Sequence, residues 1–61
     1  MEKYNANWLK KMRLKKGLTQ KKLAEKTGIS IHTIANIEQG QRKGSPATWK
    51  KILNFFKKEN N

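Results

Sequence analysis

The sequence predicts an all-α domain, and three observations carry this prediction. Apolar side chains recur every three or four residues through most of the chain, which is the spacing of one helix face. Glycines and candidate capping residues divide these apolar patterns into four segments. No alternating run of apolar and polar residues is long enough to form a strand. We therefore expect a compact four-helix domain, with room for no more than a vestigial fifth helix.

The first helix is expected to begin near Lys3 and to end before Gly17. Its apolar residues then share one face: Tyr4, Trp8, Leu9 and Met12. The fourth helix is expected to begin at the pair Ser45-Pro46, because serine caps helix N-termini and proline needs no N–H donor at the first helical position. The following residues are expected to be core: Trp8, Trp49, Ile52, Leu53 and Phe56.

The C-terminal segment raises two further expectations. Residues 57–61 are charged and polar, so we expect them to fray into solvent. Phe55 lies about 110° from the centre of the apolar stripe of the fourth helix. Two roles remain open for this side chain, namely covering the first helix or anchoring a dimer.

Residues 20–39 form the most informative segment, because two short helices must turn sharply between them. Thr19 and Ser30 are suitable N-caps for these helices, and Gly28 suits the left-handed conformation that the turn requires. Ala24 is small enough to let the helices approach closely. Four apolar residues supply their shared contact: Leu23, Ile29, Ile34 and Ile37. This joint pattern predicts a helix-turn-helix.

These motifs resemble the Cro/repressor-type, or XRE-type, helix-turn-helix family found in phage repressors, mobile-element regulators and antitoxins. The resemblance extends from Leu9 to Phe56 and rests on Leu9, Met12-Arg13, Gly17-Leu18-Thr19-Gln20, Leu23-Ala24, Gly28-Ile29-Ser30, Ile34 and Ile37-Glu38-Gln39-Gly40. It implies a single lambda-repressor-like DNA-binding domain over residues 1–61. It also implies a homodimer, formed before or only upon binding an inverted-repeat operator in double-stranded DNA. Family repressor domains usually add a fifth helix that helps to dimerise, for which this chain is too short.

The third helix, residues 31–39, is expected to enter the major groove. Its apolar side faces inward through Ile34 and Ile37, so its opposite side must meet solvent or a ligand. The resemblance implies that base reading falls to four positions of this helix, Ile31, His32, Thr33 and Asn36. It also implies base contacts by Gln20, at the first turn of the second helix.

The side chains in this set suit base edges to different degrees. Asn36 can bind adenine through two hydrogen bonds, although it could also be a solvated surface residue. His32 has three open roles: a guanine contact, a phosphate contact or an inert exposed position. Ile31 fits either a thymine methyl group or a contact with the second helix. Thr33 can serve bases or the DNA backbone.

Positive charge surrounds the third helix but is absent from it. The chain has a net charge of +11, yet residues 27–41 contain no lysine or arginine. Cations hold phosphates while neutral groups at base edges supply specificity, so this distribution fits sequence-specific binding. The expected phosphate contacts are Lys10, Thr19, Gln20, Gln39, Arg42 and Lys43.

Glu38 is expected on the inward side of the third helix, where an unpaired carboxylate is costly. In the family the matching glutamate pairs with an arginine from the first helix. The resemblance therefore implies an ion pair between Arg13 and Glu38, which would hold the first helix against the third.

Composition excludes several other classes of protein. A chain of 61 residues with no cysteine, no aspartate and one histidine is a poor candidate for an enzyme or a metal site, and we expect no cofactor or small-molecule substrate. We expect no membrane association, and a cytoplasmic, bacterial or phage-encoded protein located with the nucleoid.

The leading interpretation is a sequence-specific transcriptional regulator, a repressor from a phage, plasmid or conjugative element. Two alternatives remain open. One is an antitoxin that masks a protein toxin and autoregulates through DNA. The other is a cationic amphipathic peptide that acts on membranes, which the four-helix layout with its helix caps disfavours.

Overall fold

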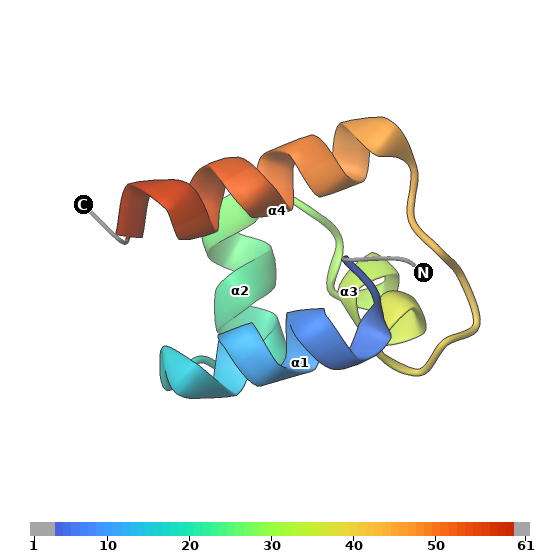
Figure 1. Ribbon diagram of the computed structural model, residues 1–61, viewed down its shortest axis with the longest axis horizontal. Helices are drawn as coiled ribbons and strands as arrows, with labels where there is room; N and C mark the ends of the chain where they lie inside the picture. The colour runs from blue at the N-terminus through green and yellow to red at the C-terminus, as the bar shows by residue number, and fades with distance from the viewer. Residues whose placement is uncertain (1–3, 60–61) are drawn as a thin grey trace.

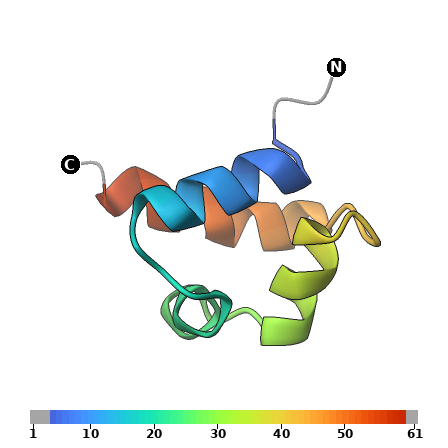
Figure 2. The ribbon, with the colours of Figure 1, turned by 90° about the horizontal axis from the view of Figure 1, so that it is seen from below.

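The computed structural model describes residues 4–59, which form four helices and no strand. These helices are α1 (Ala6–Lys15), α2 (Gln20–Thr27), α3 (Ile31–Glu38) and α4 (Pro46–Glu59). Helices α1 and α4 run side by side in one layer, and α2 and α3 form a second layer (Figure 1 and Figure 2). Helix α2 packs against α3 and α4, while α1 packs against α3. The predicted all-α class is confirmed. No helix of the described residues is long and apolar enough to cross a membrane.

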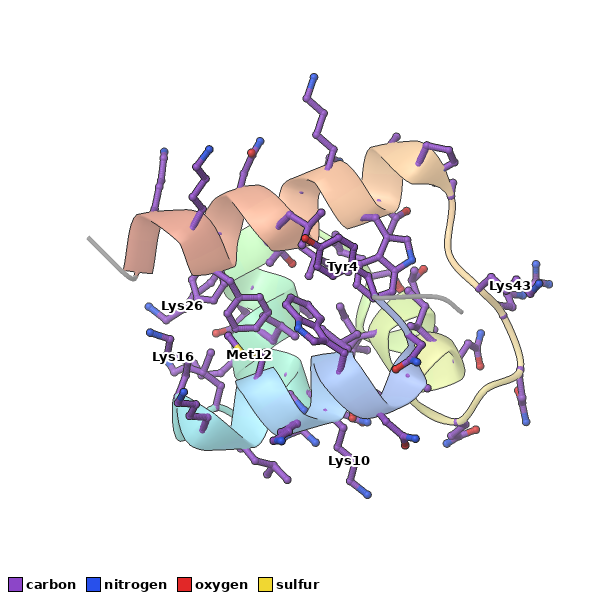
Figure 3. The ribbon with its side chains drawn as sticks, viewed as in Figure 1. Tyr4, Lys10, Met12, Lys16, Lys26 and Lys43 are labelled. Carbon is purple, nitrogen blue, oxygen red and sulfur yellow. The ribbon has the colours of Figure 1, made fainter. Side chains whose placement is uncertain are left out.

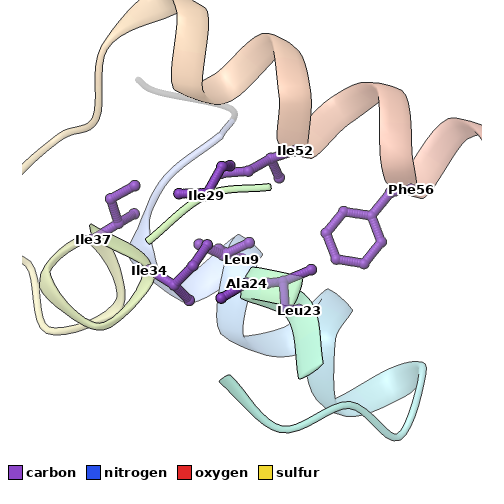
Figure 4. Close-up of a cluster of buried hydrophobic side chains, with 8 residues drawn as sticks. All are labelled: Leu9, Leu23, Ala24, Ile29, Ile34, Ile37, Ile52 and Phe56. Atoms are coloured by element: carbon purple, nitrogen blue, oxygen red, sulfur yellow. The ribbon is translucent and has the colours of Figure 1, made fainter. Parts of the chain in front are cut away.

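The core lies between the two layers and consists of side chains that are at most 9% exposed. Its members are Leu9, Leu23, Ala24, Ile29, Ile34, Ile37, Ile52 and Phe56 (Figure 4). The four apolar residues expected to join the two helices of the turn are all among them. Ala24 is also buried, so a larger side chain at this position would force neighbouring residues apart.

The local signals at the helix ends are present as expected. Thr19 caps α2, Ser30 caps α3 and Ser45 caps α4, with oxygen-to-nitrogen distances of 3.0, 3.1 and 3.2 Å to backbone N–H groups of the first turns. Gly28 ends α2 with a φ angle of 74°, in the left-handed region. The chain can therefore reverse direction within a few residues between α2 and α3.

Helix α1 begins later than the sequence pattern suggested. It starts at Ala6, because the side chain of Asn5 accepts the N–H of Trp8 at 3.0 Å and thereby caps the helix. Tyr4 precedes the helix and packs edge-on against Trp8, with ring centroids 5.0 Å apart. The expected start near Lys3 lies outside the described residues.

The ends of α3 and α4 also differ from expectation. Helix α3 ends at Glu38, one residue earlier than expected, and Gln39 is its C-cap. Helix α4 continues to Glu59, so the expectation that the chain frays from residue 57 is wrong for residues 57–59. Lysine is a good helix former and its charge is favourable in a last turn, which accounts for the continuation. Residues 60 and 61 lie outside the described part.

Three residues expected in the core are only half-buried, namely Trp8, Trp49 and Leu53. The two indole rings pack against the core with centroids 6.1 Å apart, and such large rings at its border remain partly exposed. Leu53 borders a hollow between α1 and α4. Phe55 packs against Phe56, with ring centroids 5.1 Å apart, and lines a hollow beside the end of α2.

Arg13 and Glu38 form a bidentate ion pair that joins α1 to α3. The two nitrogen-to-oxygen distances are 2.7 and 3.0 Å, and the side chains are 10% and 3% exposed. The remaining guanidinium nitrogen of Arg13 donates to the carbonyl of Leu18 at 2.7 Å. The amide of Gln20 donates to Glu38 at 3.2 Å. One carboxylate thus ties the end of α3 to both α1 and α2.

The loop between α3 and α4 is held by an indole and a glycine. The indole nitrogen of Trp49 donates to the carbonyl of Lys43 at 2.6 Å. Gly44 has a φ angle of 81°, and a Cβ atom at this position would lie 2.8 Å from the Trp49 indole nitrogen and 2.9 Å from Ile37. The loop can therefore approach α4 this closely only where it has no side chain.

We expect Arg13→Ala to destabilise the domain by about 3 to 5 kcal/mol, because it leaves the buried Glu38 carboxylate without its main partner. For a domain of this size the melting temperature should fall by more than about 10 °C. The matched control is Lys22→Ala, which removes an exposed pair with Glu25 at 3.8 Å and should change stability by less than about 1 kcal/mol. Equal melting temperatures for the two variants would refute the structural role of the buried pair.

We expect Gly44→Ala to destabilise the domain by about 2 to 4 kcal/mol, since it combines a left-handed backbone with overlap against Trp49 and Ile37. Gly28→Ala is the control, because it has a similar φ angle but a Cβ atom there meets nothing within 4 Å. The control should lose only about 1 to 2 kcal/mol. Chemical denaturation measures both, and a smaller loss at residue 44 than at residue 28 would contradict the close packing.

Candidate nucleic-acid interface

Helix α3 divides into a buried face and an accessible face. Ile34 and Ile37 are at most 1% exposed and fix the inward side. The residues expected to read bases from this helix are all at least partly accessible: Ile31, His32, Thr33 and Asn36. Ile31 and His32 lie in the first turn of α3, which Ser30 caps. They are more exposed than Thr33 and Asn36, and Ile31 is 40% exposed. Ile31 thus presents part of its apolar side chain to solvent.

Gln20 connects the start of α2 to the end of α3 through its hydrogen bond to Glu38. This contact braces the end of α3 against the start of α2. The residue is half-buried, whereas Thr19 just before it is exposed and caps the same helix. The N-terminus of α2 therefore has a fixed position relative to α3, and its positive dipole end suits a phosphate.

The loop after α3 places two cations next to this helix. The carbonyl of Asn36 accepts the N–H groups of Gln41 and Arg42 at 3.0 and 3.3 Å, so the chain folds back beside the helix. A hollow of about 490 Å³ forms there and is lined by Thr33, Ile37, Arg42, Lys43, Gly44 and Ser45. The structure thus brings Thr33, an expected base reader, together with Arg42 and Lys43, two expected phosphate contacts.

The other expected phosphate contacts are more widely spaced. Gln39 is exposed at the C-cap of α3. Lys10 extends from α1, in a different direction from Lys43 on the loop (Figure 3). The structure therefore does not bring Lys10 together with the cations of the α3–α4 loop.

Sequence reasoning predicted the two cations of the α3–α4 loop but missed the residues that shape this loop beside Thr33. Gly44 and Ser45 line the hollow beside Thr33, and Trp49 fixes the loop through the carbonyl of Lys43. The run Gly44-Ser45-Pro46 was an available signal, because it marks a tight approach to the start of α4. The partner of the Trp49 indole could not be read from the sequence.

The electrostatics of the site follow from these positions. Glu38 is the acidic residue of α3, and its carboxylate points into the ion pair with Arg13 rather than toward the accessible face. That face consequently presents an imidazole, a hydroxyl and an amide, with cations on the loop that follows. Neutral donors and acceptors of this kind can match base edges, while the flanking cations can neutralise phosphates.

Comparisons with known proteins support the same interpretation. The helix-turn-helix family HTH_3 matches residues 9–59. A search of curated proteins found no match. Among solved structures, a point mutant of the restriction-modification controller protein C.Esp1396I is similar, with 31% sequence identity and a TM-score of 0.78 over 85% of this chain. The match spans 66% of that protein, which is slightly less than two thirds of its length. The chain belongs to the XRE-type helix-turn-helix family of DNA-binding transcription regulators.

Proposed function

We propose that this chain is a sequence-specific transcription regulator that reads the major groove of double-stranded DNA with α3. The observation that carries the proposal is the neutral accessible face of α3 beside the cationic loop containing Arg42 and Lys43. In this assignment Gln20, Ile31, His32, Thr33 and Asn36 contact bases. The phosphate contacts come from Lys10, Thr19, Gln20, Gln39, Arg42 and Lys43.

The finer part of the proposal concerns the biological setting. The similar solved structure is a restriction-modification controller protein, which supports a regulatory role. We propose a cytoplasmic repressor, encoded by a phage, plasmid or conjugative element, that binds an inverted repeat as a homodimer. Two recognition helices would then lie about 34 Å apart, one turn of B-form DNA.

Selection from random duplex DNA, repeated at two salt concentrations, tests this function. We expect a defined motif with twofold symmetry, because a symmetric dimer presents two copies of α3. The affinity for the selected site should fall with salt, since each neutralised phosphate contributes about −0.9 to the logarithmic slope. Equal retention of all sequences at both salt concentrations would refute sequence-specific reading.

We expect Asn36→Ala to relax the preference for one base pair of the selected site by about 1 to 3 kcal/mol, because the amide would no longer match adenine. Lys43→Ala should instead weaken all sequences alike and reduce the salt slope by about 1. Binding measured on single-base variants of the site separates the two effects. Asn54→Ala and Lys50→Ala, exposed positions on α4, are the matched controls and should leave both quantities unchanged.

An unchanged base preference in the Asn36→Ala variant would contradict the role of this residue. A sequence-dependent loss in the Lys43→Ala variant would contradict its assignment to phosphate.

A further inference from the structure

A second hollow lies between α1 and α4. Its volume is about 480 Å³, and its apolar lining comes from Tyr4, Trp8, Met12, Leu53 and Phe56. None of the residues that line it belongs to α2 or α3. Tyr4 and Met12 are visible in it between the two ribbons, on the side of the α1–α4 layer that faces the viewer (Figure 3). We refer to this hollow as the α1–α4 groove.

Most residues that line the α1–α4 groove are apolar or aromatic, and Asn54 and Lys57 complete the lining. Tyr4 is 39% exposed, and Trp8, Met12 and Leu53 are only half-buried. Tyrosine and tryptophan dominate the energetics of protein interfaces, and methionine adapts its shape to a partner. A concave surface of this composition, bounded by two helices, fits the apolar face of a third helix.

Lysines border the groove along both of its walls. On α1, Lys11 and Lys15 each follow a groove residue by three positions, so they lie on the adjoining part of the helix surface. On α4, Lys50 and Lys57 flank Leu53 by three and four positions. All four lysines are exposed.

Acidic side chains are missing from these walls. Helix α1 contains no acidic residue, and neither do the described side chains of α4, residues 46–58. Among the described side chains of these two helices, none therefore neutralises the four lysines. An apolar floor between two positive rims is complementary to a helix with one apolar face and acidic flanks.

We propose that the α1–α4 groove binds an acidic amphipathic helix of a partner protein. A second copy of this chain would bring the same lysine rims together, and like charges across an interface cost affinity. A DNA backbone has no apolar face to cover the floor of the groove. A membrane surface suits an apolar face that protrudes, whereas this one is concave.

The position of the groove separates this interaction from DNA reading. The residues that line the groove lie in the α1–α4 layer, whereas the reading helix α3 belongs to the other layer (Figure 2). A partner helix of about 14 residues, matching the length of α4, can occupy the groove while α3 remains accessible. The inferred interaction therefore does not depend on the DNA sequence that the protein recognises.

A designed peptide tests the proposal directly. The probe is a fluorescently labelled peptide of about 14 residues with leucine along one helical face and glutamate along the others. Its controls are a scrambled peptide of the same composition and a peptide with lysine in place of glutamate. Fluorescence anisotropy with the 61-residue chain should show binding at least about tenfold tighter for the probe than for either control.

Charge-matched variants locate the binding site. Lys11→Glu combined with Lys57→Glu should weaken binding of the probe at least about tenfold. Lys21→Glu combined with Lys26→Glu gives the same net charge but alters exposed positions on α2, and should change the affinity less than about twofold. Leu53→Asn should weaken binding without unfolding the chain, because Leu53 lies outside the buried core. Thermal melting of each variant verifies that it is folded.

Four outcomes would overturn the proposal. Equal weakening by the two charge-reversed pairs would show that the peptide follows net charge only. Unchanged affinity in the Leu53→Asn variant would place the peptide elsewhere. Concentration-dependent dimerisation that this substitution abolishes would assign the groove to a second copy, and stronger groove-dependent binding to vesicles of anionic lipid would assign it to a membrane.

Discussion

The buried contact between Arg13 and Glu38 is the interaction on which the arrangement of this domain depends. An eight-residue apolar core can hold four short helices together, but hydrophobic contacts alone specify orientation weakly. The guanidinium and the carboxylate are joined by two hydrogen bonds, which restrict their relative orientation, and Gln20 donates a further hydrogen bond to the same carboxylate. The direction of α3 relative to α1 and α2 is therefore set by hydrogen bonds whose loss would be costly.

The same contact shapes the electrostatics of the accessible face. Because the carboxylate of Glu38 is paired with Arg13, no acidic group of α3 would repel a DNA phosphate. The cations stand instead on the following loop, whose position depends on the hydrogen bond between Trp49 and Lys43 and on the missing side chain of Gly44. Residues that stabilise the fold, such as Glu38, Trp49 and Gly44, therefore also determine the charge beside α3. The opposite layer has a separate charge pattern, with lysines along an apolar groove rather than around a neutral helix.

Most of the fold could be predicted because its signals are local. Capping by Thr19, Ser30 and Ser45 and the turn at Gly28 each involve residues within a few positions of one another. The predicted start of α1 near Lys3 was wrong, because the side chain of Asn5 caps the helix and makes it begin at Ala6. The half-burial of the two tryptophans and the position of the α3–α4 loop depend on contacts between distant helices, which periodicity alone does not encode. The Arg13–Glu38 pair came from the family resemblance, and the roles of the base-reading residues remain predictions.

The central claim is that the domain contacts DNA mainly with α3, the start of α2 and the α3–α4 loop. From α1 only Lys10 reaches a phosphate, and the rest of α1 and α4 supports the other two helices. A titration of the isotopically labelled chain with a selected duplex, followed by amide chemical shifts, tests it most directly. The account predicts the largest shift changes at residues 19–20, 31–36 and 41–43, with little change along the α1–α4 groove. Changes concentrated on Lys11, Lys15, Lys50 and Lys57, with α3 unaffected, would contradict it.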